Sequence, residues 1–126
     1  YRCAASFAGV TDFKKILKYD AEFFERKQHK KWKLRVQGED GFNMDQVSPA
    51  RQIARLNRPV LLAHGDVDTT VPFDQFKDMK AAAQKASKPI ETIVFEGEAH
   101  GFNKPANAQK WLETLEAFLA RHNPAE

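Results

Sequence analysis

Short apolar runs alternate with longer polar stretches along this chain. Residues 2–8 are small and apolar and end at Gly9, which predicts a short buried strand. Residues 60–63 form a continuous apolar run with polar boundaries, a pattern typical of a parallel strand covered on both faces. Residues 90–95 are rich in β-branched and aromatic side chains and predict a third strand.

Two further stretches have the spacing of an amphipathic helix. The first covers residues 73–86, and its apolar face consists of Phe76, Met79, Ala83 and Ala86. The second begins near Pro105, a residue suited to the first helical turn, and stops at residues 123–124. Its apolar stripe consists of Ala108, Trp111, Leu112, Leu115, Phe118 and Leu119.

The region between the first two strands is polar and mostly helical in composition. It covers residues 12–56 and is broken at Gly38 and Gly41. Because Ile53 and Leu56 fall on one face, a short helix is predicted between residues 50 and 57. Three strands joined through helical crossovers predict parallel pairing and an α/β architecture.

Composition narrows the class of protein only slightly. The 126 residues have the size of one small domain, and 42% hydrophobic content is ordinary for a globular protein. The net charge of +3 does not argue for a nucleic-acid or membrane partner, and no run approaches the ~18 apolar residues of a membrane span. The single cysteine, Cys3, excludes an internal disulfide framework and leaves the compartment open.

A candidate acid–base pair follows the second and third predicted strands. Residues 64–72 read His-Gly-Asp-Val-Asp-Thr-Thr-Val-Pro, and residues 97–102 read Gly-Glu-Ala-His-Gly-Phe. Loops at the carboxyl ends of adjacent parallel strands meet at one edge of the sheet, so Asp66 or Asp68 can approach His100. Strand, acid, helix, strand, histidine is the order in which an α/β-hydrolase supplies the last two members of a Ser-Asp-His triad.

Each motif alone has a simpler explanation. An Asp-x-Asp run before a helix is often a turn with an N-cap, and a histidine beside glycine is often a loop residue. Their joint occurrence, in order and after successive strands, favours the acid–base pair. The serine is missing: Ser6, Ser48 and Ser87 all lie outside a Gly-x-Ser-x-Gly elbow, and Cys3 lacks the elbow glycines as well.

The two motifs resemble the catalytic domain of the prolyl oligopeptidase family of serine peptidases, in particular its acylaminoacyl-peptidase and dipeptidyl-peptidase branches. The resemblance is good over residues 48–120, loose over 1–20 and weak over 21–47. It implies that Asp68 is the triad acid and His100 the base. Asp66 falls at a variable position of the motif and is interpreted as a turn or capping residue, and His64 as structural.

The resemblance also implies what lies outside the chain. The serine elbow and its oxyanion donors would precede Tyr1, so residues 1–126 are expected to be the C-terminal segment of a peptidase catalytic domain, inactive alone. The expected partners are a peptide substrate and the remainder of the parent polypeptide, with no cofactor and no metal. A hydrophobic substrate pocket drawing on Val10, Phe13 and Val71 is an expectation to which ordinary packing is an equal alternative.

Two other functions stay open at this stage. The chain also fits a carboxylesterase or dienelactone-hydrolase-like enzyme of the same fold, since fold and triad do not fix the acyl group. It also fits a non-catalytic binding module that lost the elbow. The basic run at residues 26–35 is interpreted as a solvated helix face rather than a nucleic-acid patch, because acidic residues flank it. The open edge of residues 2–8 predicts contact with the rest of the protein or a homo-oligomer.

Overall fold

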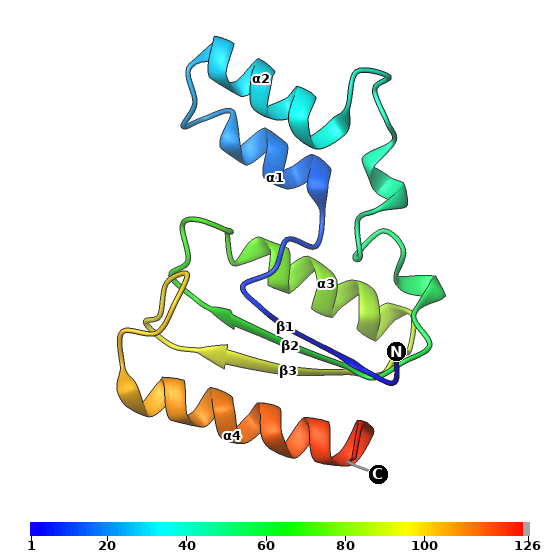
Figure 1. Cartoon of the computed structure of the whole chain (residues 1–126), viewed down its shortest axis with the longest axis vertical. Coiled ribbons are helices and arrows are strands. Elements are labelled where there is room, and N and C mark those ends of the chain that lie inside the picture. Colours follow the sequence, from blue (N-terminus) through cyan, green and yellow to red (C-terminus); the bar gives the residue numbers. More distant parts are fainter. Residues whose placement is uncertain (125–126) are drawn as a thin grey trace.

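A computed structural model describes residues 1–124, which form a three-stranded parallel sheet with helices on both faces (Figure 1). The strands are β1 (Ala4–Phe7), β2 (Val60–Gly65) and β3 (Ile90–Phe95), and β2 lies between the other two. Both pairings are parallel. The prediction of an α/β architecture with three parallel strands is therefore confirmed.

Two helices cover opposite faces of this sheet (Figure 1). They are α3 (Asp74–Lys85) and α4 (Pro105–His122). On the α3 face, Leu62 of β2 packs with Phe76 and Met79 in one buried cluster. On the other face, the ring of Phe7 lies 5.8 Å from that of Trp111 in α4. Strand β2 is buried because it has a helix on each face and a strand on each side.

The apolar stripe predicted for the last helix is partly wrong. Phe118 is fully buried and Trp111 is half-buried, but Leu112 and Leu119 are 63% and 38% exposed. The two leucines each follow a stripe residue by one position, a rotation of about 100° around the helix. A sheet of three strands covers only a narrow strip of α4, so this flank stays uncovered.

The region before β2 contains two α-helices and two single 3-10 turns. These are α1 (Phe13–Asp20), α2 (Arg26–Gln37), η1 (Met44–Gln46) and η2 (Ile53–Arg55). The short helix predicted over residues 50–57 is therefore reduced to one turn, η2. Leu56 is already extended, and Pro59 disfavours helical geometry at Arg58, just before the chain enters β2.

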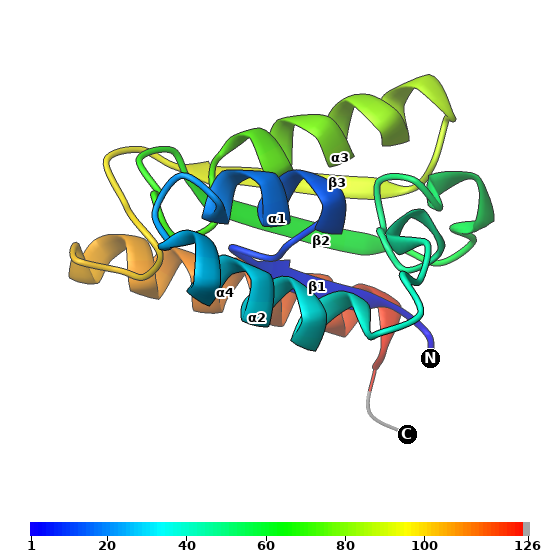
Figure 2. The same ribbon diagram turned by 90° about the horizontal axis from the view of Figure 1, so that it is seen from above.

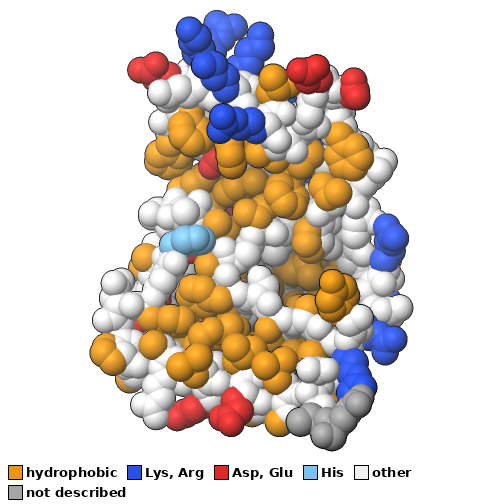
Figure 3. Space-filling model, viewed as in Figure 1, with side chains coloured by type: hydrophobic (Ala, Val, Ile, Leu, Met, Phe, Trp, Pro, Cys, Tyr) orange, Lys and Arg blue, Asp and Glu red, His pale blue; other side chains and the backbone are white. Residues whose placement is uncertain are grey.

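The α1–α2 hairpin lies on the α3 side of the sheet and is displaced toward β1 (Figures 1 and 2). Helix α2 has no buried residue. Lys and Arg side chains gather on its surface (Figure 3). The interpretation of residues 26–35 as a solvated helix face agrees with this placement.

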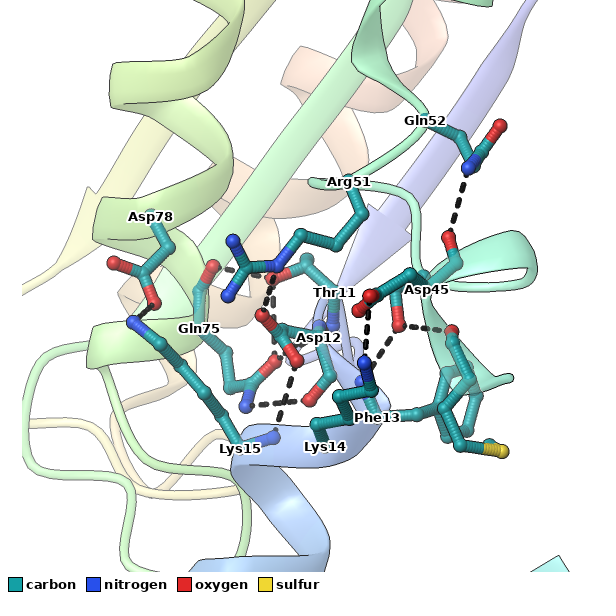
Figure 4. Close-up of polar contacts among 12 residues, drawn as sticks. Thr11, Asp12, Phe13, Lys14, Lys15, Asp45, Arg51, Gln52, Gln75 and Asp78 are labelled. Carbon is teal, nitrogen blue, oxygen red and sulfur yellow. Dashed lines mark hydrogen bonds and ion pairs between the residues drawn. The ribbon is translucent and has the colours of Figure 1, made fainter. Parts of the chain in front are cut away.

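A buried polar network joins the start of α1 to α3 (Figure 4). The Gln75 Oε1 atom accepts hydrogen bonds from the backbone N–H groups of Thr11 and Asp12, at 2.8 and 2.7 Å. In return, the Gln75 amide donates to the Asp12 carbonyl, and the Thr11 hydroxyl donates to the Gln75 carbonyl. The Asp12 carboxylate caps α1 at the N–H of Lys15 and pairs with Arg51 at 2.8 Å. This network fixes the orientation of the hairpin.

An apolar cavity of about 360 Å³ opens beside β1, between the sheet, α3 and η2. Hydrophobic side chains surround a hollow on this face of the molecule (Figure 3). Within residues 1–124, no strand pairs with the outer edge of β1. The residues lining the cavity include Val10, Ile53, Leu56, Val60, Leu62 and Met79.

Gln75→Leu should destabilise the chain substantially. The leucine fills much of the same space but leaves the N–H groups of Thr11 and Asp12 buried without acceptors, which costs about 2–4 kcal/mol of unfolding free energy. The thermal unfolding midpoint of the full-length protein, followed by circular dichroism, measures this loss. Gln84→Leu is the matched control, because Gln84 is exposed on the same helix. Equal midpoints for the two variants would contradict the role assigned to Gln75.

Candidate active site

Two loops meet at the carboxyl edge of the sheet, where β2 and β3 end (Figure 1). Residues 66–73 follow β2, and residues 96–104 follow β3. The Nδ1 atom of His100 lies 2.9 Å from Oδ2 of Asp68. The predicted approach of these two side chains is thereby confirmed.

The carboxylate of Asp68 is completely buried and held by its own loop. Its Oδ1 atom accepts hydrogen bonds from the backbone N–H groups of Thr70 and Val71, at 2.8 and 2.9 Å. A carboxylate that bonds the backbone two and three residues ahead is typical of an Asx turn. The turn uses one oxygen and leaves Oδ2 directed at His100.

His64 lies behind the acid and is also completely buried. Its Nε2 atom lies 2.8 Å from the carbonyl oxygen of Val71 and 3.4 Å from Oδ2 of Asp68. A carbonyl oxygen can only accept, so the hydrogen-bond network assigns the proton of His64 to Nε2. Nδ1 is buried without a partner. The interpretation of His64 as structural agrees with this geometry, because its bond fixes the turn that carries Asp68.

Asp66 connects the two loops. Its Oδ1 atom accepts a hydrogen bond from the backbone N–H of Gly97 at 2.6 Å. A second link runs the same way, from the N–H of Val67 to the carbonyl of Glu98 at 3.1 Å. Asp66 was interpreted as a turn or capping residue, and the structure shows instead that it bridges the two loops. Of the two aspartates, Asp68 is the one that hydrogen-bonds to His100.

The imidazole of His100 is held on one side and open on the other. Its side chain is 45% exposed. Among the described residues, Nδ1 contacts the buried Asp68 carboxylate, and no residue hydrogen-bonds to Nε2. An imidazole oriented through Nδ1 by a carboxylate, with Nε2 free, has the geometry required of a general base.

The serines of the chain lie elsewhere. The Ser48 hydroxyl is buried, donates to the Met44 carbonyl and accepts from the N–H of Phe13. Ser87 precedes β3 and so lies at the opposite edge of the sheet from His100. Ser6 is within β1, paired with Leu62. None of the three hydrogen-bonds to His100.

Of the three residues expected to contribute to a substrate pocket, one lines the apolar cavity beside β1. Val10 lines the apolar cavity beside β1, and Phe13 and Val71 are not among the residues that line it. Phe13 begins α1, and Val71 is buried in the turn that holds Asp68. Their role in binding stays a prediction.

Two contributors to the site were not singled out from sequence, Glu98 and the N–H groups of residues 70 and 71. The Asp-x-Thr spacing carried a signal for the Asx turn. Glu98 carried none, since a glutamate in a loop is usually solvated. Within residues 1–124, no group of three or more His, Cys, Asp or Glu side chains is arranged to hold a metal ion, and no helix is long and apolar enough to cross a membrane.

Gly65→Ala should disrupt the site. A Cβ atom at residue 65 would lie 2.2 Å from the carbonyl oxygen of Glu98 and 2.4 Å from that of Ala99, and backbone atoms cannot swing aside. Forcing extra atoms into a packed site costs about 1–3 kcal/mol. Gly101→Ala is the matched control, because a Cβ there meets nothing within 4 Å. The unfolding midpoint of the full-length protein should fall for Gly65→Ala only; equal effects would show that the close approach is not needed.

Comparison with known proteins shows which proteins resemble this chain. Among curated proteins, the chain is similar to dipeptidyl aminopeptidase BIII of Pseudoxanthomonas mexicana, with 24% identity over 96% of the chain and 18% of that protein. Among solved structures, it resembles a puromycin-hydrolyzing peptidase of Mycobacterium tuberculosis (27% identity, TM-score 0.80, 100% of this chain and 19% of that one).

An esterase of Thermogutta terrifontis is also similar, with 29% identity, a TM-score of 0.69, and coverage of 98% of this chain and 43% of that one. An acylaminoacyl peptidase shares the fold, with a TM-score of 0.81 and 19% identity over 100% of this chain and 21% of that one. The chain thus spans about one fifth of the peptidases it matches. The model of the prolyl oligopeptidase family matches residues 1–124. The structural relatives have the α/β-hydrolase fold. The chain therefore belongs to the prolyl oligopeptidase family and has the α/β-hydrolase fold.

Proposed function

We propose that the protein carrying this chain is a serine peptidase in which Asp68 and His100 are two members of the catalytic triad. The observation that carries the proposal is the contact of 2.9 Å between the buried Asp68 carboxylate and Nδ1 of a half-exposed histidine. Membership of the prolyl oligopeptidase family supports it. The serine is supplied by a part of the protein outside residues 1–126.

In this mechanism His100 is the general base and then the general acid. Its Nε2 takes the proton of the serine hydroxyl as the hydroxyl oxygen attacks the scissile carbonyl, and returns that proton to the leaving amine. Asp68 accepts the Nδ1–H bond throughout, which fixes the tautomer and stabilises the imidazolium. In the second half of the reaction, water gives a proton to Nε2 of His100 and attacks the acyl-enzyme carbonyl. The proton then returns to the serine oxygen as the acid product leaves, so the serine is regenerated.

The substrate is a peptide in this proposal, with Val10, Phe13 and Val71 contributing apolar surface near its side chains. The relatives whose names describe peptidases support a peptide. A carboxylesterase is the second candidate, favoured by 29% identity to the Thermogutta terrifontis esterase over almost the whole chain. The two differ in the acyl group accepted, not in the roles of Asp68 and His100.

Substitution of the pair in the full-length protein tests the triad. His100→Ala should lower kcat by about 10⁶-fold, and Asp68→Asn by about 10⁴-fold, because the base or its orientation is lost. Hydrolysis of an aminoacyl p-nitroanilide and of p-nitrophenyl butyrate measures both activities and separates peptidase from esterase. His122→Ala is the control, since His122 pairs with Glu91 at the other end of the sheet. Undiminished activity of His100→Ala would remove it from the mechanism.

A fluorophosphonate probe tests the origin of the nucleophile. The full-length protein should be labelled, and residues 1–126 expressed alone should not, because the serines of the chain lie outside a Gly-x-Ser-x-Gly elbow and do not hydrogen-bond to His100. Labelling of the isolated chain that disappears with His100→Ala would show that Ser6, Ser48 or Ser87 is the nucleophile. Absence of labelling in the full-length protein would support a non-catalytic module instead.

We further propose that the remainder of the protein covers the outer edge of β1 and the apolar cavity beside it. Residues 1–126 alone should therefore self-associate or melt without a cooperative transition, because unpaired strand edges and apolar faces associate. Sedimentation velocity and calorimetry measure the two properties. A monomeric chain with a sharp melting transition would contradict this proposal.

A further inference from the structure

We propose that Glu98 is a positioning residue of the active site, whose buried carboxylate holds the loop of residues 96–104 in the shape that presents His100 to Asp68. The inference rests on the function proposed above, and it concerns a residue that never contacts the histidine itself.

The side chain of Glu98 is fully buried and accepts three hydrogen bonds. Oε2 accepts from the backbone N–H of Asn103 at 2.7 Å, and Oε1 accepts from the backbone N–H of Lys104 at 3.0 Å. The side-chain amide of Asn107 donates to Oε1 at 2.8 Å. All three donors lie on the far side of His100 in the sequence, so the carboxylate closes the loop around that residue.

These donors belong to the start of α4. The first turn of a helix leaves backbone N–H groups without partners and carries the positive end of the helix dipole. At the N-cap position stands Lys104, whose side chain provides no cap. The Glu98 carboxylate supplies an acceptor for the N–H of Lys104, the N-cap residue, and a negative charge at this end of the helix. The N–H of Asn103, the Asn107 amide and the N–H of Lys104 together hold the pKa of Glu98 below its usual value, despite burial.

The main chain of Glu98 is fixed from the opposite side. Its carbonyl accepts the N–H of Val67 in the acid loop at 3.1 Å and approaches Gly65 too closely for any side chain there. Glu98 therefore ties the acid loop and α4 together through one residue. His100 lies in the short span between Glu98 and Asn103. Both ends of this span are fixed, and the ring of Phe102 packs 4.6 Å from that of Phe7.

A cap alone would not require this arrangement. A serine, threonine, aspartate or asparagine at residue 104 would accept from N–H groups inside the first turn, at residues 106 and 107, and would place no constraint on the loop before the helix. Here the acceptor comes from six residues earlier, across the span that carries His100. A cap placed there constrains the histidine as well as the helix, and this difference makes the proposal testable.

The test uses the full-length protein and the variants Glu98→Gln and Glu96→Gln. The second is the matched control, because Glu96 is exposed in the same loop and loses the same charge. Two readouts are taken well below the melting temperature: kcat and KM, and the downfield proton resonance of an imidazole N–H bonded to a carboxylate. A third variant, Asn107→Ala, removes only one of the three donors to Glu98. It provides a milder test in case Glu98→Gln does not fold.

Glu98→Gln should lower kcat by about 10²-fold, as misplacement of a reacting group by about 1 Å does, with KM little changed. It should also weaken or broaden the downfield resonance, whereas Glu96→Gln should alter neither. Asn107→Ala should shift both readouts in the same direction by less. The resonance reports the Asp68–His100 contact whether or not the protein hydrolyses anything, so failure of the proposed function would leave it interpretable.

A folded Glu98→Gln variant with wild-type kcat and an unchanged resonance would overturn the proposal, even if its melting temperature falls, and would leave Glu98 a helix cap alone. If Glu98→Gln does not fold, wild-type kcat and resonance in Asn107→Ala would overturn it in the same way. If the wild-type protein shows no hydrolysis, the proposed function fails, and the resonance alone decides the role of Glu98.

Discussion

The register of β2 against β3 is the constraint on which the rest of this structure depends. The two parallel strands pair from Val60 with Ile90 to Gly65 with Phe95, so both loops leave the sheet at the same level. Gly65, the last residue of that register in β2, lets the backbone of residues 98 and 99 approach closely. A shift by one residue would replace this glycine at the contact and turn every side chain of β2 to the opposite face.

The strands and the two helices that cover them were predictable from the spacing of apolar residues. A strand buried on both faces is a continuous apolar run, and a helix buried on one face has apolar residues three or four positions apart. The errors have physical causes. Leu112 fits a helical stripe by spacing alone, but the area that a sheet covers depends on its width, which spacing does not record. The segment around Ile53 has helical spacing, yet the entry of the chain into β2 after Pro59 leaves room for one turn.

The candidate site was predictable where strand order decides proximity. Asp68 and His100 follow adjacent parallel strands, and this alone brings them to one edge. What stabilises the buried Asp68 carboxylate could not be read fully in advance. Hydrogen bonds to charged groups contribute about 1.5–3 kcal/mol each, so the N–H groups of residues 70 and 71 contribute substantially to holding this side chain in place. The role proposed for Glu98 depends on the path of the loop through space, which no residue pattern encodes.

The separation of Asp68 and His100 by 32 residues has a consequence for folding. The contact closes a single strand–helix–strand unit. The entropic cost of closing such a loop rises only with the logarithm of its length. Contacts of short sequence separation form early, whereas pairing with distant segments is slow. We therefore expect Asp68 and His100 to come together in an early folding unit, onto which the segment proposed to carry the serine docks later. The order of assembly would then be the reverse of the order of the proposed reaction, in which the serine attacks first.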